Sequence, residues 1–268
     1  MKRYFIVCIV LLSVGAGAAA IEPPEFGVAV GLRGASSTDK NLPTWLVGNR
    51  YGFYQTTQHQ LLSETHLSYS QELSRFFSLS GEATFQGAYS ESSDLRLPIA
   101  YLALFGGPFV LHGGRYPLQV GQLPIPALSS GSMSVSANAM PIPRITGRTD
   151  GFIGIPGLPS QVRTNFGLSH GWFEEQRSTE SPLLHEKWLY LQFAEERVYS
   201  IYGGLVHQVM WAGENDANST LPADLENYMN VFLNRSGGSD VSTSDQLNKA
   251  GNALGIWDLG FSVDIGIT

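Results

Sequence analysis

The sequence has almost no cysteine and little charge. Its single cysteine, Cys8, lies in an apolar run at the start of the chain, so disulfides and thiolate metal sites are excluded from the remainder. Only 15% of the residues are charged, against about 25% in ordinary soluble proteins. The net charge is −7, which argues against nucleic acid as a partner because phosphate backbones attract basic surfaces.

Hydrophobic runs long enough to cross a membrane as a helix are also missing after Ala20, since such a helix needs about 20 apolar residues. The first residues, MKRYFIVCIVLLSVGAGAAA, combine a basic start, an apolar run and small residues. This pattern predicts a secretory signal peptide over residues 1–20, cleaved after Ala20. An exported chain without a membrane helix is periplasmic, secreted or a β-barrel in the outer membrane.

Long alternating segments are what the sequence does contain. In SLSGEATFQGAY, residues 78–89, Leu79 and Phe85 lie on one face, with serine, glutamate and glutamine side chains on the other. Such alternation indicates a β-strand with one apolar and one polar face. At about 3.3 Å per residue, the strand from Phe77 to Tyr89 is about 40 Å long. Tilted by about 45°, it would rise about 28 Å, close to the apolar height of an outer-membrane barrel.

Ten segments of this kind predict ten spanning strands. They lie near residues 26–34, 60–72, 76–89, 95–105, 109–117, 129–138, 161–173, 183–193, 198–211 and 254–267. The clearest of them carry no Lys, Arg, Asp or Glu on the apolar face, which suits lipid because a midplane Lys or Arg costs about 2–4 kcal/mol. The predicted fold is therefore all-β, an antiparallel transmembrane β-barrel over residues 21–268. A periplasmic β-sandwich or jelly roll is the alternative.

The lengths of the connections support a barrel, in which short periplasmic turns alternate with longer outer loops. The predicted short turns are Leu73–Arg75, Gly106–Pro108 and Ala194–Arg197. Residues 212–253 then form an outer loop. Residues 45–54, WLVGNRYGFY, also alternate, but an extra span there would break the parity. We expect them in the first outer loop or folded back into the lumen. The Pro- and Gly-rich residues 141–160 are expected to form a periplasmic plug or cap.

The long outer loop contains a helical pattern. In LPADLENYMNVFL, Leu225, Tyr228, Met229 and Phe232 have helical spacing, and Asp224 lies in the first turn. We expect this helix to pack on the barrel mouth or on another loop. The loop is also acidic, with Glu214, Asp216, Asp224 and Glu226. These oxygens could hold Ca²⁺, but their spacing is not that of an EF-hand, so a solvated acidic loop is the preferred interpretation.

One predicted strand carries side chains that suit sugars. In HEKWLYLQF, Glu186, Trp188, Tyr190 and Gln192 share the lumen face. Aromatic rings stack on the C–H faces of sugars, and carboxylates and amides pair with hydroxyls. The alternative is a lumen packed shut by the same residues. Scattered Ser, His and Asp residues form no recognisable nucleophile motif, so we expect no catalytic residues, no metal and no cofactor.

Two arginines are candidates for binding acidic sugars. Arg144 and Arg148 lie in PIPRITGR, where the prolines restrict the backbone to extended conformations. Either cation could pair with the carboxylate of a uronic acid. Alternatively, Arg144 forms an internal brace with Glu186, and this is the simpler interpretation.

The sequence resembles the Wzi family of outer-membrane capsule-assembly proteins. The resemblance rests on five blocks and on LPTWLVGNRYG (42–52). The blocks are LSSGSMSVSANAMPIPRI (128–145), LSHGWFEEQR (168–177), LLHEKWLYLQF (183–193), YGGLVHQVMWAG (202–213) and LNKAGNALGIWDLG (247–260). Members of the family are β-barrels that hold capsular polysaccharide at the cell surface without known catalysis. Their barrels exceed ten strands, and VDIGIT lacks a terminal aromatic residue, so the resemblance implies that the sequence is either the front part of a longer protein or a truncated gene product, and closure of the barrel is left open.

The predicted function is therefore non-enzymatic binding of capsular or other surface polysaccharide, with a role in capsule assembly or attachment. The expected location is the bacterial outer membrane, with lipid as the second partner and loops exposed at the cell surface. Two alternatives remain open. A porin-like diffusion channel would use the same lipid face around an open lumen, and an outer-membrane hydrolase would place its serine at the lumen edge.

Overall fold

The structure is a computed structural model that describes residues 23–121, 132, 134–174, 179–195, 199–215, 220–238, 246–247 and 249–263. The strands of its main sheet are β1 (Glu25–Ser36), β2 (His59–Ser74), β3 (Phe77–Tyr89), β4 (Ser93–Gly106), β5 (Phe109–Arg115), β6 (Pro143–Thr149), β7 (Ile153–Gly154), β8 (Val162–Trp172), β10 (Leu183–Glu195), β11 (Tyr199–Trp211) and β14 (Asn252–Val263). A second, small sheet contains β9 (Thr179–Glu180), β12 (Gly213–Asn215) and β13 (Thr220–Leu221). The described helices are α1 (Thr44–Val47) and α2 (Leu225–Phe232).

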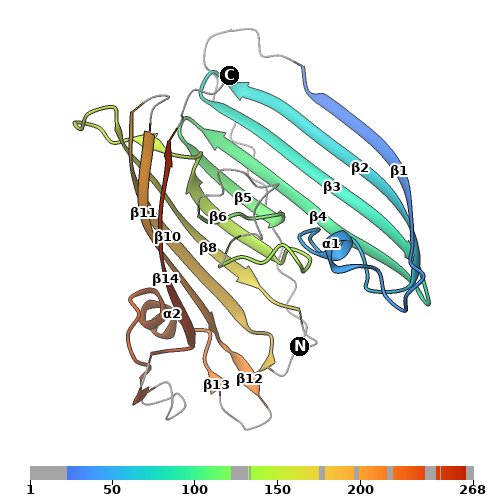
Figure 1. Cartoon of the computed structure of the whole chain (residues 1–268). Coiled ribbons are helices and arrows are strands. Elements are labelled where there is room, and N and C mark those ends of the chain that lie inside the picture. The colour runs from blue at the N-terminus through green and yellow to red at the C-terminus, as the bar shows by residue number, and fades with distance from the viewer. Residues whose placement is uncertain are drawn as a thin grey trace.

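The main sheet follows the order of the chain. Its 11 strands run β1-β2-β3-β4-β5-β6-β8-β10-β11-β14, with β7 paired to the side of β8, and the paired strands are antiparallel. Figure 1 shows a strongly curved wall with β1 at one end and β14 at the other. The prediction of an all-β antiparallel fold is confirmed.

One of the ten predicted strands is wrong. The described residues between 132 and 138 form no strand, and the sixth long strand of the sheet is β6 instead. Residues 134–138 carry small side chains, and their polar groups bind another loop: Ala137 O accepts a hydrogen bond from Tyr51 N, and Asn138 Oδ1 accepts one from Asn49 N. The expectation of a plug over residues 141–160 is also wrong, because β6 lies within that range and is a strand of the main sheet.

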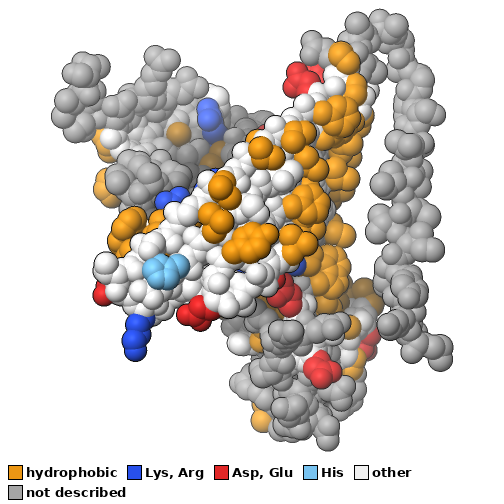
Figure 2. All heavy atoms as spheres, turned by 90° about the vertical axis from the view of Figure 1, so that its right-hand side faces the viewer, with side chains coloured by type: hydrophobic (Ala, Val, Ile, Leu, Met, Phe, Trp, Pro, Cys, Tyr) orange, Lys and Arg blue, Asp and Glu red, His pale blue; other side chains and the backbone are white. Residues whose placement is uncertain are grey.

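The two faces of the sheet have opposite character. On β3, Thr84 and Gln86 are buried on the concave face, whereas Phe85 and Tyr89 on the convex face are 46% and 52% exposed. β1 follows the same rule, with Phe26 and Val30 exposed on the convex face. Large apolar side chains are thus exposed along the convex face while polar ones such as Thr84 and Gln86 are buried on the concave face, unlike the pattern of a soluble protein whose apolar face packs on a core. Figure 2 shows hydrophobic side chains running along the strands over the outer surface.

A β-bulge keeps this arrangement along β4. The register against β3 shifts between the pairs Gln86–Arg96 and Thr84–Ile99, and Pro98 lies in the shifted part. Proline lacks the N–H that a regular ladder needs, so it is tolerated at a bulge. Because of the extra residue, odd-numbered side chains lie on the convex face before the bulge and even-numbered ones after it. The exposed leucines are accordingly Leu95 and Leu97, then Leu102 and Leu104.

The concave face is covered near its middle by the chain that follows β5. Tyr116, Leu118 and Val120 pack there in a buried cluster with Trp188, Tyr190 and Val206. Glycine in the neighbouring strands makes room for the two largest rings. A Cβ added at Gly167 would lie 2.1 Å from the ring of Trp188, and one at Gly204 would lie 2.1 Å from the ring of Tyr190.

The predicted helix in the long loop is confirmed as α2. Asp224 is its N-cap, and its side chain accepts a hydrogen bond from Asn227 N at 2.8 Å. Val231 of the helix packs with Ala212 and Ala250 of the loop between β11 and β14. The helix also contacts residues of the convex face, among them Val209 and Trp211 at the end of β11. No helix among the described residues has the length and apolar character that a membrane crossing needs.

Candidate functional site

A wide cavity lies between the first strands and the loop that joins β1 to β2. Residues 37–58 connect β1 to β2, and part of this connection lies against the concave side (Figure 1). The cavity has a volume of about 670 Å³ and is bounded by β1, β2, β3 and β4 on one side and by residues 46–54 on the other. The segment WLVGNRYGFY (45–54) therefore folds back over the concave face of the first strands, which corresponds to the second of its two expected placements.

The fold-back depends on several residues with left-handed backbone conformations. Asn49, Tyr51 and Gly52 have φ angles of 55°, 53° and 69°. Non-glycine residues rarely adopt this region, and such strain persists only where surrounding contacts impose it. Here Tyr51 N donates to Ala137 O at 2.5 Å, and Asn49 N donates to Asn138 Oδ1 at 2.8 Å. A Cβ at Gly52 would lie 2.9 Å from Met140 N, so glycine is required there on steric grounds as well.

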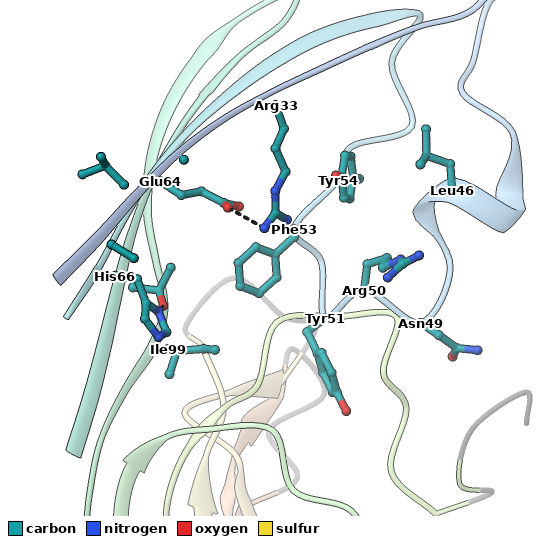
Figure 3. A pocket seen from close by; sticks show the side chains of 14 residues that line it. Arg33, Leu46, Asn49, Arg50, Tyr51, Phe53, Tyr54, Glu64, His66 and Ile99 are labelled. Carbon is teal, nitrogen blue, oxygen red and sulfur yellow. Dashed lines mark hydrogen bonds and ion pairs between the residues drawn. The ribbon is translucent and has the colours of Figure 1, made fainter. Parts of the chain in front are cut away.

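The strand side of the cavity presents fixed polar groups (Figure 3). Arg33 of β1 forms an ion pair with Glu64 of β2 at 3.2 Å. Glu64 also accepts a hydrogen bond from Gln86 Nε2 at 3.0 Å. Deeper along the sheet, His66 Nε2 lies 3.1 Å from Glu82, and Tyr101 OH donates to Glu82 Oε2 at 3.1 Å. These contacts hold both carboxylates in place, and Arg33 balances the charge of Glu64.

The loop side supplies aromatic rings and an uncommitted cation. Tyr51, Phe53 and Tyr54 line the cavity together with Asn49 and Arg50. Figure 3 shows these loop residues across the cavity from Arg33, Glu64 and His66. Arg50 is exposed, and within the described residues it has no carboxylate partner. The site therefore combines half-buried aromatic surface, an amide and a guanidinium that is available to a ligand.

Arg144 and Glu186, two of the predicted binding residues, lie together. Arg144 Nη1 donates to Glu186 Oε2 at 3.2 Å, and the two side chains are 6% and 0% exposed. Gln208 Nε2 donates to the other carboxylate oxygen. This is the geometry of the internal brace, the simpler of the two interpretations. All three residues also line a cavity of about 260 Å³, which Tyr51 separates from the larger one.

The other predicted residues lie apart from that pair. Arg148 Nη1 donates to Thr149 O at 3.2 Å, and Arg148 lines a void of about 30 Å³ with Trp188 and Tyr190. Trp188 Nε1 donates to Asn165 Oδ1 at 2.8 Å, and Tyr190 OH donates to Asp258 Oδ2 at 3.0 Å. The rings of Trp188 and Tyr190 pack with Tyr116, Leu118 and Val120, so the concave face of the sheet is filled at these positions.

The residues that sequence reasoning missed are Arg33, Arg50 and the aromatic side chains of the fold-back. Their signal was present in WLVGNRYGFY, where three aromatic residues follow an arginine within five positions. The pattern is expected in the first outer loop or folded back into the lumen, and nothing local indicates that Arg33 lies opposite it. Within the described residues there is no group of three metal-binding side chains. The predicted alternative of a Ca²⁺ loop includes Asp216, which lies outside the described residues, and it stays untested.

No protein-family model matches the chain, and no curated protein sequence is significantly similar to it.

Proposed function

We propose that this chain forms part of the wall of an outer-membrane β-barrel and binds surface polysaccharide on its concave side, as members of the Wzi family do. The observation that carries the proposal is the reversed polarity of the sheet. Large apolar side chains are exposed on strands from β1 to β14, including Phe26, Leu102, Leu189 and Trp257. Exposed apolar area this wide marks a surface that is covered by a partner.

Lipid is the partner that best suits this surface. The strands of the long sheet place apolar residues on the convex side and polar residues on the concave side, the alternation typical of outer-membrane barrels. A soluble sandwich would need a second apolar sheet to cover the convex face. The described residues contain only a three-stranded second sheet, at the end of the wall. Lipid requires no such cover, and the signal peptide expected at residues 1–20 supplies export.

Polysaccharide is the ligand that best suits the concave side. Tyr51, Phe53 and Tyr54 offer rings for the C–H faces of sugars, and Asn49 can pair with hydroxyls. Arg50, which has no carboxylate partner in the part of the chain that the structure describes, adds a cation for a carboxylate, so acidic sugars are favoured. The Tyr116–Val120 segment packs across the concave face, which favours binding over the porin-like alternative. No catalytic arrangement is needed for this function.

Retention of acidic polysaccharide by the detergent-solubilised protein tests the proposal. Immobilised protein is titrated with a uronic-acid capsular polysaccharide and, separately, with neutral dextran. We expect Arg50→Gln to weaken binding of the acidic chain about tenfold or more, since a hydrogen bond to a charged group contributes about 1.5–3 kcal/mol. Arg235→Gln, which removes an exposed arginine of the α2 loop, is the matched control. Absence of binding by the unmodified protein would refute the proposed function.

A further inference from the structure

Helix α2 lies on the convex face, at the end of the wall near the long loop. Tyr228 and Phe232 contact the ring of His185, with centroids 5.6 and 5.5 Å apart. Val231 is buried with Val209 and Trp211 of β11. Figure 1 shows α2 beside β14 and β11, outside the curve of the sheet. The helix thus covers one end of the surface that the proposed function assigns to lipid.

The helix covers the polar part of that surface. His185 and His207 are buried, and Lys187 lies opposite His207 in the register of β10 and β11, two positions after His185. Lys187 Nζ lies 4.5 Å from the centroid of the Phe232 ring and donates a hydrogen bond to Phe232 O at the end of the helix. A cation at a helix C-terminus is stabilised by the helix dipole and by the free carbonyls there. Without α2, these groups would face the same surroundings as the neighbouring leucines.

The side of α2 that faces away from the sheet is itself apolar along one stripe. Leu225, Met229 and Leu233 follow one another at intervals of four residues and are 75%, 42% and 44% exposed. Residues four apart lie on one side of a helix. Glu226 and Asn230 occupy the adjoining sector. Tyr228 and Val231 already form the side of the helix that packs on the sheet. In water, the second apolar stripe would add no stability to the helix.

The stripe is close to the exposed leucines of the strands. Leu189 follows Lys187 by two positions on the same face of β10. On the antiparallel strand β11, Leu205 precedes His207 by two positions on that same face. At about 3.3 Å per residue, these leucines begin about 7 Å from the residues that α2 covers. Leu189 and Leu205 are 53% and 41% exposed. The apolar band of the sheet therefore starts where the helix ends.

We propose that α2 is an interfacial helix that lies in the loop-side surface of the membrane. Leu225, Met229 and Leu233 contact lipid acyl chains, Glu226 and Asn230 face water, and the inner side shields Lys187 and the histidines. Amphipathic helices bind the interface in this way through a narrow apolar side. The inference rests on the proposed function, because it requires that the convex face contacts lipid.

Spin labels test the position of the helix. In a Cys8→Ala background, labels are placed singly at Met229→Cys, Asn230→Cys and Leu189→Cys in the full protein reconstituted in phosphatidylcholine vesicles. Collision with oxygen, which partitions into lipid, is compared with collision with a water-soluble nickel chelate. We expect the label at position 229 to resemble the one at 189, with oxygen favoured, and the label at 230 to favour the nickel chelate.

Each other result overturns a defined part of the reasoning. If positions 229 and 230 both favour the nickel chelate while 189 favours oxygen, the helix lies in water and only this inference fails. If position 189 also favours the nickel chelate, the convex face does not contact lipid and the proposed function fails with it. Spin–spin broadening at 229 that disappears on dilution with unlabelled protein would show that a second copy covers the stripe, which contradicts the assignment to lipid.

Discussion

The buried ion pair between Arg144 and Glu186 offers the most quantitative prediction. Both side chains are almost fully buried, and Gln208 is the further hydrogen-bond donor to the carboxylate. Arg144→Met would leave a carboxylate in the interior with a single neutral partner. Glu186→Gln would leave a guanidinium without its counter-charge. Loss of one partner of a buried pair costs about 3–5 kcal/mol, so each single variant should lower the free energy of unfolding by an amount in that range.

The double variant distinguishes a brace from two independent residues. Arg144→Met combined with Glu186→Gln removes both charges, so no ion is left unpaired. We expect it to be less destabilised than the sum of the single variants, with a coupling energy of about 2 kcal/mol or more. Guanidinium denaturation in detergent micelles, followed by tryptophan fluorescence, measures all four proteins. Additive effects within about 0.5 kcal/mol would refute the brace.

An exposed ion pair of the same type serves as the control. Arg115 lies 3.3 Å from Glu174, whose side chain is 61% exposed. Exposed pairs contribute about 0–1 kcal/mol because water screens the charges. Glu174→Gln should therefore leave the free energy of unfolding nearly unchanged. If it destabilises the protein as much as Glu186→Gln does, burial is not the cause of the effect at Glu186.

Three further predictions follow from the fold. Gly204→Ala should destabilise the protein by about 1–3 kcal/mol because its Cβ would overlap the ring of Tyr190, whereas Gly147→Ala, which meets nothing within 4 Å, should have a much smaller effect in the same denaturation assay. A protease-cleavable tag inserted after Gly237 should be cut on intact cells and one at Arg75 should not; the opposite pattern would invert the orientation of the wall. Asp224→Ala should loosen α2 by about 1 kcal/mol through loss of its N-cap, seen as faster amide exchange at Asn227, and Asp224→Asn should not.

The strands were largely predictable because alternation is a local property of the sequence. The pattern of SLSGEATFQGAY matches the exposure of Phe85 and the burial of Gln86 in β3. The same reasoning failed at residues 129–138, where serines alternate with Gly131, Met133, Val135 and Ala137 as regularly as in a strand. An alternation of two residues indicates which side chains share a face. It does not supply the contacts between β-branched and aromatic side chains that stabilise the pairing of one strand with another. The segment that pairs with β5 and β8 instead is β6, which carries the β-branched residues Ile145, Thr146 and Thr149.

The site was less predictable because it depends on contacts between distant parts of the chain. The pairing of Arg144 with Glu186 could be foreseen as an option, since both lay on predicted ordered segments. The cover over Trp188 and Tyr190 could not, because the alternation of Tyr116, Leu118 and Val120 gives no sign of the strands on which they pack. The cavity beside Arg50 depends on the left-handed residues of the fold-back and on their contacts with residues 137–140, which no local rule specifies.

Arginine substitution on the two faces of the sheet tests the central claim most directly. Phe85 is exposed on the convex face of β3, and Ser70 is exposed on the concave face of β2. A charge placed in lipid near the midplane costs about 2–4 kcal/mol, whereas one on the concave face remains in water. Assembly into outer membranes is measured by fractionation and by resistance of the folded protein to urea extraction. The account predicts that Phe85→Arg fails to assemble and that Ser70→Arg assembles normally. Equal assembly of both variants would contradict it.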